Sequence, residues 1–184
     1  SAATVASTPS PTGPPAQTST APATQATNVT PGTPGTPSTT GSSGDGFARV
    51  TCAFTLDQAK LNEVLTAVNA YRAQSGLPAY TVSPQLALAA QAHANDMACN
   101  GLFFHTGSNG STIQSRVKAS GYIAASSSEN VYGSYPPLNG QGVVNWWKTD
   151  KVDPRHNLNL VSDKFKEIGV GYAFFNNYGY YVIV

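Results

Sequence analysis

His105, Glu129 and His156 carry the side chains of this sequence that are best suited to metal binding or acid–base chemistry. Such groups are scarce here, because the 184 residues include only three histidines and nine acidic residues. Each of the three has a glycine, proline or asparagine within two positions, which is typical of loops. Loops are where binding and catalytic groups are commonly displayed. Residue type and position alone still favour a plainer interpretation, in which three surface residues never meet.

The composition changes sharply near Gly46 and divides the chain into two parts. Residues 1–46 contain no aromatic residue, no Leu or Ile, and a single charged residue, Asp45. Such a segment cannot bury enough apolar surface to offset the entropy of ordering its backbone, and its prolines favour extended conformations. We therefore expect residues 1–46 to be a disordered linker or stalk, and residues 47–184 to be one globular domain.

Charge and hydropathy argue against two classes of partner. A net charge of +1 gives no support for binding to nucleic acid or to an anionic membrane. No apolar run approaches the roughly 20 residues that a membrane-spanning helix needs. We expect a monomeric protein without a membrane span.

Two amphipathic helices are predicted in the first half of the domain. Thr55-Leu56-Asp57-Gln58 has the pattern of a capping box with Thr55 as N-cap, and apolar residues then recur at helical spacing as far as Gly76. A second helix begins at Ser83-Pro84, a preferred cap followed by proline at the first helical position, and ends at Gly101. A short connection allows the two helices to pack antiparallel.

Cys52 and Cys99 are the only cysteines. The antiparallel helix pair would return Cys99 towards Cys52, as a disulfide requires. A polar, Thr- and Pro-rich stalk indicates a secreted or cell-surface protein, a location where disulfides persist. We therefore favour a Cys52–Cys99 bond over the alternative, two buried free thiols. His93 lies on the apolar side of the second helix, and we expect it to be a core residue hydrogen-bonded to the backbone.

The last third of the domain changes to strand periodicity. Short helices are predicted at residues 111–120 and 141–150, after which residues 168–174 alternate large apolar side chains with Gly or Ala. A second alternating run, residues 180–184, follows the turn-forming sequence Asn176-Asn177-Tyr178-Gly179. Helices first and a hairpin last predict an α+β fold with an antiparallel sheet.

Five segments of the globular part occur in an order that matches a known family. They are residues 97–105, ending in Phe103-Phe104-His105, residues 116–122, Ser128-Glu129-Asn130-Val131, residues 143–150, with Trp146-Trp147, and residues 156–172. Together they resemble the CAP superfamily, which includes cysteine-rich secretory proteins, insect venom allergens and plant pathogenesis-related proteins. The bacterial SCP-like branch is the most similar, because the cysteine-rich signatures of the eukaryotic members are missing. The resemblance covers residues 55–184.

The resemblance implies a three-layer α-β-α sandwich with a central antiparallel sheet, and a cleft lined by two histidines and two acids. By position, His105 and His156 are the histidines, Glu129 is one acid, and Asp150 stands where the family usually has glutamate. These four residues form the predicted site for zinc or another divalent metal. The Asp150 carboxylate reaches about 1.5 Å less than that of glutamate, so contact through water is an alternative to direct ligation. Arg155 replaces the small residue that usually precedes the second histidine.

Three functions remain open at this stage. The favoured one is a non-enzymatic secreted module that binds a small hydrophobic ligand or a component of the cell envelope, because the resemblance implies such ligands. The alternative is a metal-dependent hydrolase acting on peptide or cell-wall substrates, with Glu129 as general base. The third is a structural or adhesive envelope protein with an inherited polar cleft. The loop serines are too numerous to single out a nucleophile, so no catalytic residue is assigned.

Overall fold

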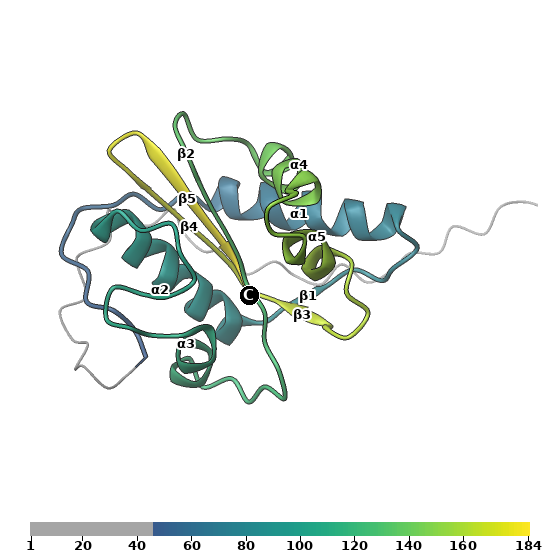
Figure 1. Ribbon diagram of the computed structural model, residues 1–184, viewed down its shortest axis with the longest axis horizontal. Helices are drawn as coiled ribbons and strands as arrows, with labels where there is room; N and C mark the ends of the chain where they lie inside the picture. The colour runs from purple at the N-terminus through teal and green to yellow at the C-terminus, as the bar shows by residue number, and fades with distance from the viewer. Residues whose placement is uncertain (1–45) are drawn as a thin grey trace, which may run out of the picture. The chain divides into compact units, whose positions relative to one another are not determined.

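The computed structural model describes residues 46–184 of the chain. Residues 1–45 lie outside the described part, and with them nearly all of the linker predicted for residues 1–46. Helices and strands are mixed along the described residues (Figure 1). In chain order they are α1 (Gln58–Gln74), β1 (Thr81–Val82), α2 (Pro84–Asn100), α3 (Ile113–Ala119), β2 (Asn130–Ser134), α4 (Gly140–Thr149), α5 (Arg155–Leu160), β3 (Glu167–Ile168), β4 (Val170–Phe175) and β5 (Tyr178–Ile183).

Two separate small sheets are present among the described residues. β2, β5 and β4 form an antiparallel sheet with β5 in the middle, while β1 and β3 pair in parallel. The predicted hairpin is β4–β5, and its turn residues Asn176 and Asn177 both have positive φ, as the asparagine pair predicts. The α+β class is therefore confirmed. A single central sheet in a three-layer sandwich stays a prediction, because the strands are divided between two sheets.

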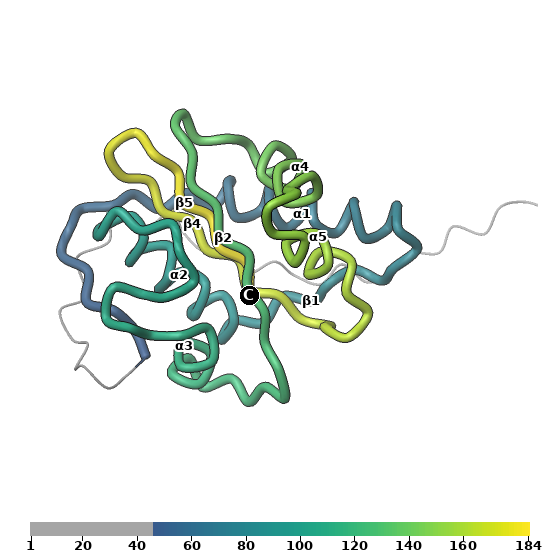
Figure 2. Tube along the Cα trace, viewed as in Figure 1, coloured from purple at the N-terminus to yellow at the C-terminus, as the bar shows by residue number. Residues whose placement is uncertain are grey.

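The helices lie on both sides of the antiparallel sheet. Figures 1 and 2 show α2 and α3 on one side of the strands and α1, α4 and α5 on the other. One apolar core joins α1 and α4 to the sheet and includes Val64, Val143 and the fully buried Trp147. A second core joins α2 to the opposite face and includes Met97 and Val182. Burial of both faces accounts for the alternation of large and small residues in β4 and β5.

Small residues of the β4 segment let α2 approach the sheet closely. A Cβ added to Gly169 would lie 2.0 Å from the backbone carbon of Leu86, and one added to Gly171 would lie 2.4 Å from that of Ala90. Any side chain at these glycines would push the helix away. The Gly and Ala positions noted in the sequence thus mark the face on which α2 packs.

The start of α1 differs from the sequence prediction. The N-cap is Asp57, whose carboxylate accepts hydrogen bonds from the backbone N–H groups of Ala59 and Lys60. Thr55, the predicted cap, instead pairs its own backbone N–H and carbonyl with Phe174 of β4. Its extended, sheet-like pairing leaves it unable to cap the helix, and the first turn begins two residues later.

Two further local predictions are confirmed, whereas the strand predicted at residues 168–174 is divided between β3 and β4. Ser83 caps α2 with proline at the first helical position, and Gly101 ends the helix in the left-handed conformation. Cys52 and Cys99 form a disulfide across 47 positions.

Within residues 46–184 no helix is both long enough and apolar enough to cross a membrane.

Candidate functional site

His105 is held by a buried ion pair between Glu129 and Arg116. Its Nδ1 lies 3.0 Å from Glu129 Oε1, and Glu129 Oε2 accepts a hydrogen bond of 2.8 Å from Arg116 Nη2. The same guanidinium nitrogen donates to the backbone carbonyl of His105 at 2.9 Å. The side chain of Glu129 is 0% exposed and that of Arg116 is 2% exposed. Arg116 and Glu129 therefore fix both the backbone and the ring of His105.

His93 lies behind this ion pair, in the core where it is predicted to be. Its Nε2 is 2.9 Å from the carbonyl oxygen of Phe104 and 3.8 Å from Glu129 Oε1. Burial lowers the pKa of His93 below its ordinary value of 6.5, against the opposing attraction of Glu129. His93 is therefore neutral at pH 7, and Arg116 is the cation that balances Glu129.

The loop that carries His105 is tied to α2 by a buried aspartate. Asp96 accepts hydrogen bonds from the backbone N–H of Ser108 at 2.8 Å, from the Ser108 hydroxyl at 2.6 Å and from the Asn100 amide at 2.8 Å. Asp96 is only 1% exposed. Three donors on one buried carboxylate make this loop part of the rigid frame of α2.

His156 comes from the other side of the sheet and is held in a similar way. It lies on α5, and its Nδ1 is 2.8 Å from Asp150 Oδ2 at the end of α4. A hydrogen bond from the backbone N–H of Val152 lowers the pKa of Asp150, so this carboxyl stays ionised. The Asn130 amide also donates to the carbonyl of His156 at 2.9 Å. Asp150 thus contacts and orients the ring of His156 directly.

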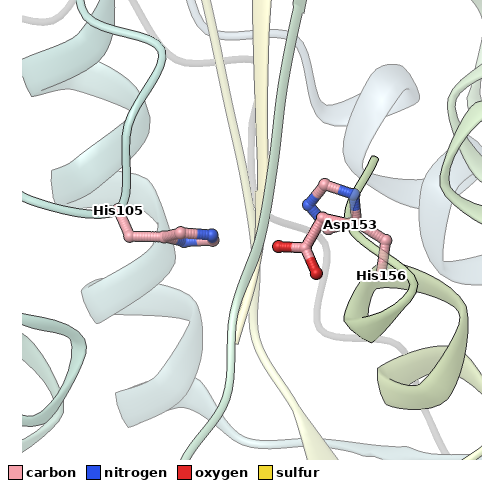
Figure 3. A group of neighbouring side chains, drawn as sticks. All are labelled: His105, Asp153 and His156. Carbon is pink, nitrogen blue, oxygen red and sulfur yellow. The ribbon is translucent and has the colours of Figure 1, made fainter. Parts of the chain in front are cut away.

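The two histidines meet across β2, an edge strand of the antiparallel sheet. Ligand atoms of His105, Asp153 and His156 all lie within 4.8 Å of one another. Figure 3 shows His105 on one side of the strands and Asp153 with His156 on the other, their polar ends turned towards one another. Because Glu129 and Asp150 occupy the Nδ1 atoms, the Nε2 atoms are the ring nitrogens free to bind a ligand.

The Nε2 atom of His156 is buried and has no hydrogen-bond partner among residues 46–184. A buried polar atom without a partner is costly and needs an explanation. Zn²⁺ bonds of about 2.0–2.2 Å place neighbouring ligand atoms roughly 3.4 Å apart in a tetrahedral site. The present group would have to contract by up to about 1.4 Å to reach that spacing, a shift that the Asp153 carboxylate, held by the exposed Arg155, can supply. The donor set therefore fits a divalent metal.

The four residues predicted for the site form two histidine–carboxylate pairs, His105–Glu129 and His156–Asp150. Asp153 also lies close to both histidines, and the sequence did not single it out as a site residue. Its only signal was its position three residues before His156. Arg116 was also missed as a functional residue, because a basic residue on a short helix ordinarily indicates a solvated face.

Among the described residues, the carboxylate of Asp153 accepts hydrogen bonds from one neighbour, Arg155. The guanidinium donates from Nε to Oδ1 at 2.8 Å and from Nη2 to Oδ2 at 2.7 Å, and the backbone N–H of Arg155 donates to Oδ1 at 3.0 Å. This contact with Arg155 lowers the pKa of Asp153 to about 2. The carboxylate is consequently ionised at any pH at which the histidines are neutral.

A pocket of about 280 Å³ opens next to this site. One wall is the loop 122–128, rich in Ala and Ser, and the floor includes Leu86, Ile168 and Ile183. Lys164 and Lys166 also line it. Glu129 belongs to the lining as well, so the pocket and the histidine pair share this residue. The volume is close to the lower end of small-molecule sites, which hold about 300–1,000 Å³.

Three solved bacterial structures are similar in fold. An extracellular protein containing a SCP domain from Bacillus anthracis is 20% identical with a TM-score of 0.60, covering 70% of this chain and 41% of its own. An outer surface protein from Borrelia burgdorferi is 18% identical with a TM-score of 0.58, covering 71% and 93%. A cysteine-rich secretory protein from Staphylococcus aureus is 14% identical with a TM-score of 0.52, covering 69% and 38%. The present chain thus spans well under half of the Bacillus and Staphylococcus chains.

The sequence comparisons agree with the family resemblance. No curated protein sequence matches the chain significantly. A family model does match, over residues 65–184, and its description is the cysteine-rich secretory protein family, CAP. The matched residues include α2, the antiparallel sheet and both histidines of the site. The chain therefore belongs to the CAP, or cysteine-rich secretory protein, family.

Proposed function

We propose that this protein is an extracellular binding module in which His105, Asp153 and His156 hold a divalent metal, zinc by preference. The observation that carries the proposal is the buried, unpartnered Nε2 atom of His156, which faces a second imidazole and a carboxylate. Two neutral imidazoles and one carboxylate are a donor set that zinc accepts, with a fourth position left open. Glu129 and Asp150, predicted as ligands, take instead the role of orienting the rings.

Binding without catalysis is the function that the site supports best. In the hydrolase alternative Glu129 acts as general base, a role that needs a free carboxylate oxygen within reach of water. Both oxygens of Glu129 are already engaged, one by His105 and one by Arg116, and its side chain is 0% exposed. An acid fixed in this way orients the histidine and makes a poor proton acceptor.

We also propose the extent of the domain and its location. We take residues 47–184 as one CAP domain with the three-layer α-β-α organisation that the family resemblance implies, carried on the linker of residues 1–46. The disulfide favours an oxidising, extracellular setting. The similar bacterial structures, one of an extracellular protein and one of an outer surface protein, support secretion or display at the cell surface.

Zn²⁺ should bind the full chain with one site per molecule in a calorimetric titration at pH 7.5. The His105→Ala/His156→Ala variant should bind at least about 100-fold more weakly, because it lacks both imidazole ligands. Asp163→Asn is the matched control, since Asp163 is an exposed carboxylate outside the group and its substitution should leave the affinity unchanged. Equal heats from the wild type and the double variant would refute metal binding here. Metal-dependent turnover of peptide or peptidoglycan substrates would favour the hydrolase instead.

The pocket beside Glu129 is the place that we propose for a small, mostly apolar ligand. The anionic dye 1-anilinonaphthalene-8-sulfonate is a suitable probe, because it fluoresces on entering apolar sites and carries a charge that Lys164 or Lys166 can meet. Ser127→Trp, which fills the pocket from its loop wall, should weaken dye binding at least about tenfold.

Leu88→Trp introduces the same side chain at an exposed position of α2 outside the pocket, and dye binding should be kept in this control. Equal binding by Ser127→Trp and the wild type would place the dye elsewhere and remove the support for a ligand in this pocket.

A further inference from the structure

We propose that Arg155 limits the metal affinity of the His105–Asp153–His156 site by holding the Asp153 carboxylate in a competing interaction. This inference rests on the proposed function, because it concerns the metal site described above. Arg155 binds no metal itself. It determines whether the Asp153 carboxylate, the third ligand, is free to bind one.

The acids beside the histidines and the arginine beside Asp153 contact different kinds of atom. Glu129 and Asp150 contact the Nδ1 atoms of the histidines and leave Nε2 open, so they orient each ring without blocking it. Arg155 contacts both oxygens of Asp153, which are the atoms that would bind a metal. Its effect on the third ligand is therefore competitive.

The geometry of the pair makes the competition strong. Within residues 46–184, three hydrogen bonds reach the Asp153 carboxylate and all come from Arg155, two of them from the planar guanidinium in a bidentate arrangement. The ligand atoms of the group must approach from separations of up to 4.8 Å to roughly 3.4 Å when a metal binds. Movement of the carboxylate towards the histidines lengthens the Arg155 bonds, and the guanidinium charge repels the incoming cation.

Arg155 is well placed for a test because its loss should not disturb folding. Its side chain is 75% exposed, whereas that of Asp153 is 20% exposed. The only ion pair that the guanidinium forms with residues of the described chain is the one with Asp153. A substitution at Arg155 thus changes the partner of one carboxylate and leaves both histidine–carboxylate pairs in place.

The experiment is a titration with Co²⁺, followed by its visible absorption, of the full chain as wild type, Arg155→Gln, Asp153→Asn and the double variant. Arg155→Gln should bind Co²⁺ about tenfold more tightly, the lower end of the effects of groups that hold metal ligands. Asp153→Asn should bind about tenfold more weakly for the same reason. In the Asp153→Asn background, Arg155→Gln should change the affinity by less than about twofold, because there is no carboxylate to release.

Arg155→Lys separates hydrogen bonding from charge. It keeps the positive charge and loses the bidentate fork, so its affinity should lie between those of the wild type and Arg155→Gln. Unchanged or weaker binding by Arg155→Gln would overturn the inference, with the metal site left standing. The same tightening in the Asp153→Asn background would also overturn it, because the effect would then be long-range charge alone. Absence of Co²⁺ binding in every variant would instead refute the proposed function itself.

Discussion

Glu129→Gln should destabilise the domain by about 3–5 kcal/mol, the usual cost of removing one partner from a buried ion pair. The substitution keeps the shape of the side chain and removes its charge. Arg116, 2% exposed, would then be a buried cation without a counter-charge, because Glu129 is the acid that forms its ion pair among the described residues. The free energy of unfolding from a urea titration at pH 7.5 measures the loss.

The double variant Arg116→Met/Glu129→Gln distinguishes the ion pair from other roles of Glu129. It removes both charges and should recover most of the stability lost in Glu129→Gln, because it leaves no unpaired charge buried. Lys60→Gln breaks an exposed ion pair with Glu63 on α1 and should change the stability by less than about 1 kcal/mol. A Glu129→Gln variant as stable as Lys60→Gln would show that this charge is not needed for folding.

The size of this effect matters for tests of catalysis. Glu129→Gln is the obvious substitution for a proposed general base, and a loss of activity in it would ordinarily be assigned to chemistry. Here the same change removes the charge that balances Arg116 and the contact that orients His105. Activity data on that variant are informative only beside the double variant with Arg116→Met.

Replacing Cys52 and Cys99 by serine should cost about 4 kcal/mol in the chain-entropy model, because the bond closes a loop across 47 positions. Both cysteines are only half-buried, so the serine hydroxyls add little burial cost of their own. The expected result is a lower urea midpoint for the double serine variant than for the wild type. Adding reductant should lower the wild type to the same midpoint and leave the variant unaffected.

The opposite outcome would be equally clear. Equal midpoints for the wild type and the double serine variant would mean that the loop is already constrained without the bond. The pairing of Thr55 with Phe174 anchors the segment next to Cys52 to β4, and it is the contact that could supply such a constraint. Alkylation of the native protein without reductant should label no thiol.

Local patterns predicted the parts of the fold that depend on neighbouring residues. Ser83-Pro84 and Gly101 bound α2 because caps and left-handed glycines act within one turn of the helix. The Asn176–Asn177 turn likewise set the hairpin. Thr55 was assigned wrongly because its partner, Phe174, is more than a hundred positions away. β1 was missed, and Ile168 of β3 was assigned to the same strand as β4, since two-residue strands paired in parallel carry no periodic signal of their own.

The sequence predicted both histidines of the candidate site but only some of its acids. The family resemblance selected His105, Glu129, Asp150 and His156, and the structure brings them together in two pairs. It could not distinguish ligands from the residues that orient them, because that depends on which ring nitrogen each acid contacts. Asp153 depended on the path of the loop between α4 and α5, which no periodicity determines.

The position of the candidate site across β2 has a thermodynamic consequence. His105 is anchored through Asp96 to α2, whereas His156 and Asp153 belong to the α4–α5 segment on the other side of the sheet. A metal held by all three would add a direct link between the elements on the two sides of the sheet. By linkage, a free metal concentration 100 times the dissociation constant would add about 2.7 kcal/mol to the stability of the folded state. The stability of this domain would then depend on the free metal concentration of its surroundings.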